Sequence, residues 1–371
     1  MIPAPARDVL PGIQLLRGVA AVMVVLSHTN TMMSHPEFFS RSPFGFELTG
    51  EFGVAIFFVI SGFIIAYVSM DAQLAPRLAT REFAWRRAIR ILPFMWLCVI
   101  GYNVLSFVGT HQVEWVPMLR ALVLWPVGEL KPNVLWSLRH EWLFYLLFAL
   151  AVLGQRRRSW ILILWFAGPV LAAIVLRLVP TAPTLVDTEW SELARMVFMG
   201  GQNGANLQFA AGYGLGLLQL RKHDAVRPRV GGGLYVVLLA VVAATLLIEN
   251  VRIYDHLVRA VCWTALSAAT VWLALVMSTG KDWLIRAGVI LGNATFAIYL
   301  VHNPVLLIEF ALALRLTPGL PLEVLYPVFA VSAVAAGVAV HYLVEAPLIR
   351  LLSKRGRAVP QSARSLAQER S

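Results

Sequence analysis

Long apolar stretches recur along the whole chain, and short polar segments between them carry most of the prolines and charges. A helix needs about 20 mostly apolar residues to cross a bilayer. About ten stretches meet this criterion, and they are residues 13–33, 52–70, 91–109, 134–153, 159–178, 203–220, 232–249, 257–278, 289–311 and 323–345. Residues 116–128 are apolar but too short to span, so they predict an interfacial or re-entrant segment. The pattern predicts an all-α, polytopic integral membrane protein of about ten transmembrane helices.

Composition and charge agree with this class. Of 371 residues, 59% are hydrophobic and 14% charged, which is atypical of a soluble globular domain. The two cysteines, Cys98 and Cys262, lie in apolar stretches and offer neither a disulfide framework nor metal-ligand spacing. About two thirds of the 31 Lys and Arg residues fall in segments on the same side of the membrane as the N-terminus. Such an excess of positive charge is typical of cytoplasmic segments. We therefore expect both termini in the cytoplasm. The net charge of +11 is expected to interact with anionic membrane lipid rather than with nucleic acid.

The apolar pattern also divides the chain. One transmembrane domain is expected over residues 13–350, between a cytoplasmic N-terminal segment, 1–12, and a basic cytoplasmic tail, 351–371, which we expect to be disordered. The glycine-rich stretch 199–216 lacks the lysine and the strand context of a phosphate-binding loop. Its small residues instead predict close approach between two helices.

The first apolar stretch, "LLRGVAAVMVVLSHTN", contains two ionisable residues, Arg17 and His28. They are separated by about three helical turns, so they share one face and lie about 16 Å apart along the axis. Such a face must meet protein or water rather than lipid. An ionisable residue inside a membrane indicates a functional site, and a structural histidine bonded to a neighbouring helix is the alternative.

Two later stretches place ionisable groups at a similar depth. His28 is expected about 8 Å and Glu141 about 10 Å below the outer surface, and His302 about 20 Å above the inner edge. All three side chains then lie in one layer of the outer half of the membrane. A general base and a carboxylate that orients it would show this arrangement.

A basic cluster marks the inner end of the third stretch, in "REFAWRRAIRILPF". Arg90 lies one helical turn beyond Arg86 and Arg87, so the three guanidinium groups are expected to form a compact positive surface. Such a surface can simply anchor the helix at the cytoplasmic interface. It can also bind phosphate, for which the planar guanidinium is well suited. Only a long, thin donor would join a phosphate site there to a base near the outer surface.

A set of motifs occurs in a fixed order along the chain. They are the R-x10-H pattern of Arg17 and His28, "GVAIFFVISGFIIAY", "RRAIRILP", "LWSLRHEWLFY", "ATFAIYLVHNP" and "VEAPLIR". In this order they resemble the membrane-bound acyltransferase-3 family, especially its branch that O-acylates bacterial exopolysaccharide and O-antigen sugars. The resemblance extends from about Ile13 to Arg350. It implies a multi-pass protein of the bacterial cytoplasmic (inner) membrane.

The resemblance also implies a reaction and its participants. The family transfers an acyl group, usually acetyl and in some members succinyl, from cytoplasmic acyl-CoA to a hydroxyl of an extracytoplasmic polysaccharide or lipid-linked sugar, and no metal is expected. The catalytic residues expected from the resemblance are His28, Glu141, Tyr299 and His302. The residues expected to bind acyl-CoA are Arg17, Ser61, Arg86, Arg87 and Arg90.

This assignment leads to a mechanistic hypothesis. His28, oriented by Glu141, would remove the proton of the sugar hydroxyl as it attacks the thioester, or would itself carry the acyl group in a relay. His302 and Tyr299 would stabilise the oxyanion or hold the acceptor.

Two neighbouring residues depart from the family pattern. Relatives more often have small or apolar residues at the positions of Arg139 and His140. His140 would be a rival titrating group, and Arg139 would suit a carboxylated acyl chain.

A secondary transporter or exporter of sugar or lipid-linked sugar is the alternative function. Such proteins tend to have two related halves and binding sites at the midplane. The off-centre ionisable groups and the absence of visible similarity between the halves of this sequence favour the enzyme.

Overall fold

A computed structural model of the chain describes residues 10–45, 50–154, 159–178, 189–199, 204–221, 256–276, 283–316 and 319–357. Within these ranges the chain is helical apart from turns, loops and one β-bridge between Met70 and Pro76. The helices, with three π-helical segments marked η, are α1 (Pro11–Ser34), α2 (Glu51–Ser69), α3 (Thr80–Thr110), α4 (Trp115–Val123), α5 (Leu135–Phe148), η1 (Ala149–Gly154), α6 (Ser159–Leu178), α7 (Glu189–Ala194), η3 (Arg195–Met199), α8 (Ala205–Arg221), α10 (His256–Val276), α11 (Trp283–Leu316), α12 (Leu322–Val340), η5 (His341–Glu345) and α13 (Ala346–Arg357).

Six helices of the described residues are long and apolar enough to cross a membrane, so the protein is a multi-pass membrane protein. They are Pro11–Ser34, Glu51–Ser69, Thr80–Thr110, Leu257–Val276, Arg286–Leu316 and Leu322–Ser353. The predicted spans 134–153, 159–178 and 203–220 are helical over residues 135–153, 159–178 and 205–220, whereas 232–249 lies outside the described residues. The count of about ten spans, and the cytoplasmic side of both termini, stay predictions. Helix α4 has 9 residues, in agreement with a segment too short to span.

Residues 351–357 are helical, whereas the whole segment 351–371 is expected to be disordered. Helix α12 continues through η5 into α13, which ends at Arg357. Leu348, Leu351 and Leu352 repeat at helical spacing among basic residues, which favours an amphipathic interfacial helix. The first part of the predicted tail is therefore helical, and residues 358–371 lie outside the described part.

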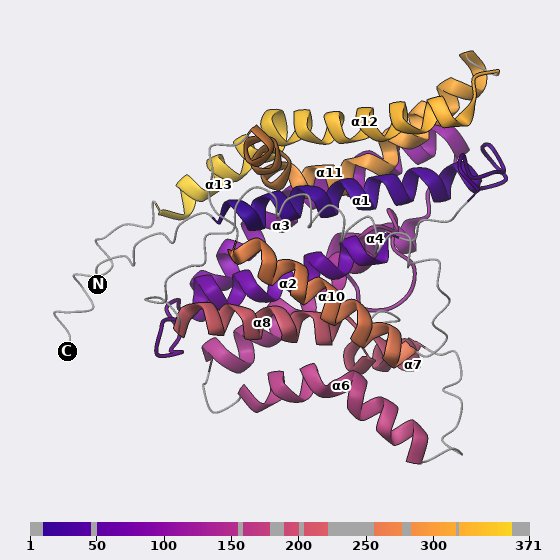
Figure 1. Cartoon of the computed structure of the whole chain (residues 1–371). Helices are drawn as coiled ribbons and strands as arrows, with labels where there is room; N and C mark the ends of the chain where they lie inside the picture. Colours follow the sequence, from indigo (N-terminus) through magenta and orange to yellow (C-terminus); the bar gives the residue numbers. More distant parts are fainter. Residues whose placement is uncertain are drawn as a thin grey trace.

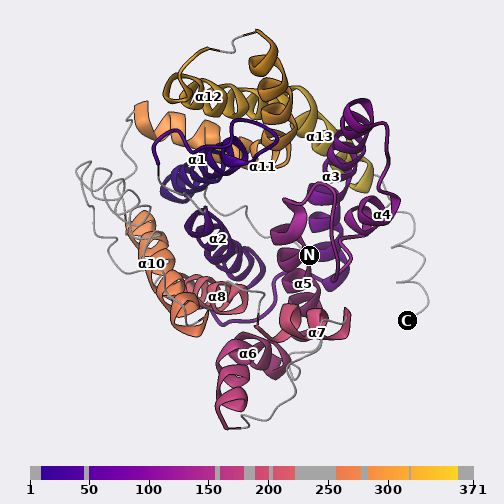
Figure 2. The same cartoon turned by 90° about the vertical axis from the view of Figure 1, so that its right-hand side faces the viewer.

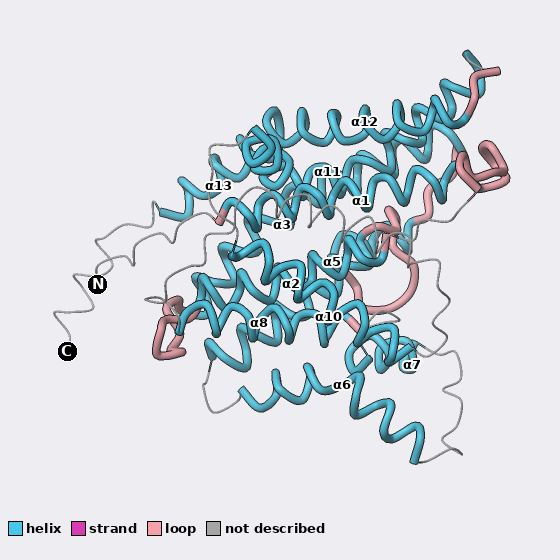
Figure 3. The backbone as a smooth tube through the Cα atoms, in the orientation of Figure 1, coloured by secondary structure: helices cyan, strands magenta, loops and turns pink. Residues whose placement is uncertain are grey.

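The long helices lie side by side, and the start of α1 and the helix α13 are at the same end of the bundle (Figure 1). Seen along the bundle, α2 has a central position, with α1 and α11 on one side of it and α8 and α10 on another (Figure 2). The connecting loops lie at the two ends of the bundle (Figure 3).

Glycines bring two helix pairs into close contact. A Cβ atom added to Gly212 of α8 would lie 1.8 Å from the carbonyl oxygen of Val59 in α2, and one added to Gly62 would lie 2.2 Å from the Phe209 carbonyl oxygen. The close approach predicted for residues 199–216 is thus confirmed in its described part. Helices α1 and α11 are equally close, since a Cβ on Gly292 would lie 2.1 Å from the carbonyl oxygen of Gln14.

Candidate active site

A cavity of about 110 Å³ lies between α1, α2, α3, α5 and α11. Its wall is largely apolar, and guanidinium groups outnumber carboxylates among its polar residues. Those polar residues are Arg17, Ser61, Arg87, Arg90, Ser137, Glu141, Tyr145, Thr295 and Tyr299. A cavity with this excess of guanidinium groups favours an anionic ligand, because charge-assisted hydrogen bonds are strong in a medium of low dielectric constant.

Helix α1 contributes Arg17 to this cavity. The guanidinium donates to the Gln14 side chain at 3.1 Å, and it interacts electrostatically with Arg90, Glu141 and Glu345. Arg17 therefore belongs to a group of charges at the start of α1, about 16 Å along the helix from His28.

Glu141 belongs to the same group. Its Oε1 accepts hydrogen bonds from the Ser61 hydroxyl, at 2.6 Å, and from the Tyr145 hydroxyl. The expected orientation of His28 by Glu141 is not what the structure shows: Glu141 lies with the arginines, and His28 contacts another residue.

The position of helix α5 explains this difference. The depth predicted for Glu141 assumes that its helix begins at Val134, at the outer surface. In the structure, the Val134 carbonyl accepts a hydrogen bond from Tyr299, which lies one turn before His302 on α11. Helix α5 therefore begins at about the level of Tyr299, and Glu141 lies about 10 Å further along it.

The arginine cluster of α3 divides between two surfaces. Arg87 and Arg90 line the cavity, and the Arg87 guanidinium lies 5.5 Å from the ring centres of both Phe83 and Tyr145. Arg86 is exposed and pairs with Glu82. It was predicted to form one surface with Arg87 and Arg90, and it does not line the cavity with them. Adjacent residues differ by about 100° around a helix, so Arg86 and Arg87 point in different directions.

A larger open groove of about 1020 Å³ runs along α3 and α5 beside the cavity. Its lining includes Arg81, Trp85 and Trp142, and it shares Arg87 and Tyr145 with the cavity. These two shared side chains thus stand between the groove and the cavity.

Two histidines meet beyond the far end of the cavity. His28 Nδ1 lies 2.7 Å from His302 Nε2, and the rings meet edge to edge, with centres 5.0 Å apart and planes 25° from parallel. His302 Nδ1 also lies 3.0 Å from the Ile298 carbonyl oxygen. The structure therefore brings together the two imidazoles of the predicted layer.

The packing of α1 on α11 explains this pairing. His28 and His302 are 274 residues apart, and so are Gly18 and Gly292, which lie at the close contact of the same helices. The helices are therefore parallel and in constant register, and their glycines allow the histidine rings to touch.

Tyr299 lines the cavity near the histidines. Its hydroxyl contacts the Val134 carbonyl and lies 2.6 Å from the Ser137 hydroxyl. Because a carbonyl only accepts, Tyr299 donates its proton to Val134, and Ser137 donates to Tyr299. The Tyr299 ring lies 6.0 Å from the His302 ring, and neither His28 nor His302 lines the cavity as described.

Some residues of the site were missed by the sequence reasoning. Tyr145 holds Glu141 and faces Arg87, Ser137 holds Tyr299, and the Asn303 side chain interacts with His28. Tyr145 and Asn303 lie within the quoted motifs at helical spacing from Glu141 and Tyr299. That spacing was the available signal.

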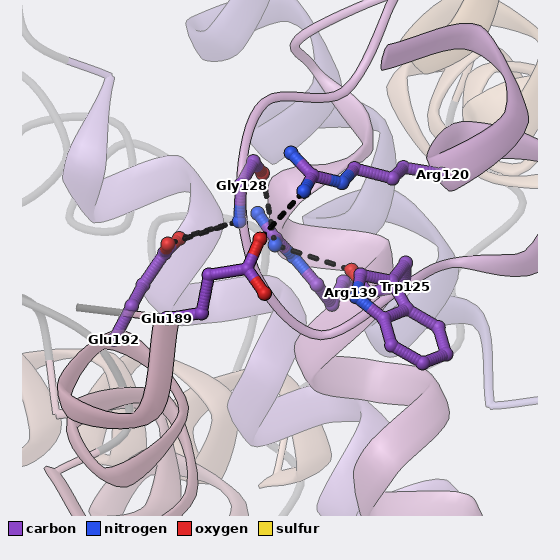
Figure 4. A network of polar contacts seen from close by, with 6 residues as sticks. All are labelled: Arg120, Trp125, Gly128, Arg139, Glu189 and Glu192. Carbon is purple, nitrogen blue, oxygen red and sulfur yellow. Dashed lines mark hydrogen bonds and ion pairs between the residues drawn. The ribbon is translucent and has the colours of Figure 1, made fainter. Parts of the chain in front are cut away.

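The loop before α5 is held by a polar network (Figure 4). Arg139 donates to the carbonyl oxygens of Trp125, at 3.2 Å, and Gly128, at 3.3 Å, while the Gly128 N–H donates to Glu192 at 2.9 Å. Arg139 is thus engaged with the backbone and is not placed to serve a carboxylated acyl chain. His140 is buried, lies 2.9 Å from the Trp136 carbonyl and does not line the cavity, so it is not a rival to Glu141 there.

Fold and site together define a multi-pass helical membrane protein with a cationic cavity between its helices that approaches a histidine pair. The chain belongs to the acyltransferase-3 family, because the family's sequence profile, described as an acyltransferase domain, matches residues 10–346. It is therefore an acyltransferase.

Two curated relatives support the same family. The chain is 29% identical to the exopolysaccharide production protein ExoZ of Rhizobium meliloti, over 83% of this chain and 91% of the relative. It is 26% identical to the acyltransferase MdmB of Streptomyces mycarofaciens, over 95% of each chain. No solved structure matches the chain significantly.

Proposed function

We propose that this protein transfers an acyl group from cytoplasmic acyl-CoA to a hydroxyl of an extracytoplasmic polysaccharide or lipid-linked sugar, in the bacterial cytoplasmic membrane. Acetyl is the donor group that we expect first, and succinyl is the second candidate. The observation that supports this proposal best is the cationic cavity, which extends from Arg17, Arg87 and Arg90 toward Tyr299, one turn from His302.

The positive charge of the cavity supports an acyl-CoA donor. The phosphates of acyl-CoA would bind Arg87 and Arg90, and the neutral pantetheine arm would pass between the apolar helix faces. Arg17 and His28 are about 16 Å apart along α1, so only a long, narrow donor reaches both. The Tyr299–Ser137 pair must move aside for the thioester to reach the histidines.

The chemistry follows from the imidazole. His28 accepts the proton of the sugar hydroxyl while the hydroxyl oxygen forms a bond to the acyl carbon. The bond between that carbon and sulfur breaks, and the proton passes from His28 to the CoA thiolate. In an acyl-histidine relay the same bonds change in two steps, and a burst of thiol release before ester formation would distinguish the relay.

The acceptor is inferred from the relatives. One relative is named for exopolysaccharide production, and the branch that the motifs resemble acts on bacterial surface sugars. A polysaccharide or lipid-linked sugar is therefore the acceptor class to test first.

The test uses the full chain in lipid nanodiscs with acetyl-CoA and a lipid-linked sugar. We expect free CoA thiol and esterified sugar from the wild type, and no transfer from correctly folded His28→Ala. Arg87→Ala should raise the KM for acyl-CoA at least about tenfold, since charged hydrogen bonds contribute about 1.5–3 kcal/mol. The matched control Arg86→Ala should change it little, because Arg86 is exposed and paired with Glu82. Sugar flux without thiol release would favour the transporter, and a fully active His28→Ala would refute the mechanism.

A further inference from the structure

His302 was expected among the catalytic residues, and its surroundings indicate a different role. We propose that His302 is a positioning residue: it fixes the tautomer and ring orientation of His28, so that His28 Nε2 is the basic atom. The chemical consequence rests on the function proposed above. The tautomer itself does not, and it can be measured independently.

The first step concerns the proton on His302. Its Nδ1 lies 3.0 Å from the Ile298 carbonyl oxygen, four residues earlier on the same helix. A carbonyl oxygen carries no proton, so Nδ1 of His302 must be the donor. In a neutral imidazole only one nitrogen carries hydrogen, and His302 Nε2 is therefore an acceptor.

The second step passes this constraint to His28. Its Nδ1 lies 2.7 Å from the acceptor nitrogen of His302, so Nδ1 of His28 carries the proton. Neutral His28 then has its lone electron pair on Nε2, the ring nitrogen left for the Asn303 side chain and for a substrate hydroxyl. The rings meet edge to edge, with planes 25° from parallel, and this contact also fixes the direction in which Nε2 of His28 points.

The third step follows the proton during transfer. When His28 Nε2 accepts a proton from the hydroxyl, Nδ1–H stays bonded to His302 and becomes a stronger donor. His302 keeps its own proton on Nδ1 and stays neutral throughout. The pair thus favours the imidazolium of His28 without a carboxylate, in the way that a hydrogen-bonded partner orients a catalytic histidine elsewhere.

Burial separates this role from direct contact with substrate. His302 is 0% exposed and does not line the described cavity. The backbone carbonyl of Ile298 and the ring of His28 engage both of its nitrogens. His302 therefore has no free polar atom to offer to an oxyanion or an acceptor hydroxyl.

The first test measures the tautomer by ¹⁵N NMR on the full chain in nanodiscs, with all 8 histidines labelled. The spectrum of His28→Gln identifies the His28 signals by subtraction. We expect the proton of His28 on Nδ1 in the wild type and in His302→Gln, whose amide oxygen can replace the acceptor. In His302→Leu we expect a shift toward the Nε2–H form. A wild-type His28 with its proton on Nε2 would overturn the proposal.

The second test measures kinetics. His302→Leu should lower kcat by about 10–100-fold, as loss of an orienting partner typically does, with the KM for acyl-CoA unchanged. His302→Gln should restore most of kcat, and the exposed His111→Leu serves as a control for the same exchange of residue types. An active His302→Leu with wild-type kcat would refute the role. Loss of activity in both variants with an unchanged His28 tautomer would indicate a purely structural contact. If the wild type releases no thiol, the proposed function fails while the NMR test still decides the tautomer.

Discussion

The contact between α1 and α11 can be tested by adding one methyl group. In Gly292→Ala, the new Cβ would lie 2.1 Å from the backbone carbonyl oxygen of Gln14, and ordinary contact begins at 3.4 Å. The helices must therefore separate by about 1.3 Å there, since backbone atoms cannot turn aside as a flexible side chain can. A rigid shift of that size would lengthen the 2.7 Å contact between His28 and His302 to about 4 Å, beyond hydrogen-bond length.

Two quantities should change in Gly292→Ala. Overpacking should lower the free energy of unfolding by about 1–3 kcal/mol, measured by thermal unfolding in nanodiscs. The rate of acyl transfer should fall by about 100-fold at a temperature where the variant is folded, because a displacement near 1 Å at a reacting group has that effect.

The matched control is Gly214→Ala, which introduces the same methyl group in α8 with no atom within 4 Å. It should keep both the stability and the rate. A Gly292→Ala protein with lowered stability and a wild-type rate would show that the histidine contact does not depend on this packing. A variant unchanged in both would disprove the close approach itself.

Three further changes test other parts of the site. Glu141→Ala removes the carboxylate that lines the cavity together with Arg17, Arg87 and Arg90, so the unfolding free energy should fall by about 1.5–3 kcal/mol; an unchanged melting temperature would contradict this. Arg139→Ala removes its hydrogen bonds to loop 124–134, and amide hydrogen exchange in that loop should accelerate; equal exchange rates would show that Arg139 does not hold it. A double-mutant cycle on Arg120 and Glu189, a pair at 2.7 Å whose carboxylate is 67% exposed, should give a coupling of about 0.2–1 kcal/mol, and a larger value would mean that solvent screens the pair less than its exposure indicates.

Much of the architecture followed from hydrophobic patterning, because a bilayer forces backbone groups into helices and ionisable groups toward the protein interior. The face shared by Arg17 and His28 and the glycine contact of residues 199–216 were predictable for this reason. For His28 and His302, the sequence predicted only that both lie at a similar depth in the membrane, and not that they contact each other.

The partner of Glu141 was not predictable from the sequence. Its depth depended on where helix α5 begins relative to the membrane, and that start is set by a tertiary contact from Tyr299 to the Val134 carbonyl. Apolar periodicity carries no information about such a contact. The separation of Arg86 from Arg87 was predictable, in contrast, because adjacent residues of a helix point about 100° apart.

The parallel pairing of α1 with α11 has a consequence for biogenesis. The two imidazoles are 274 residues apart, so the ribosome must deliver most of the chain before they can meet. Until then, His28 lies in the bilayer without its partner nitrogen. In the mechanism proposed above, acyl transfer would therefore begin only after α11 has been inserted beside α1.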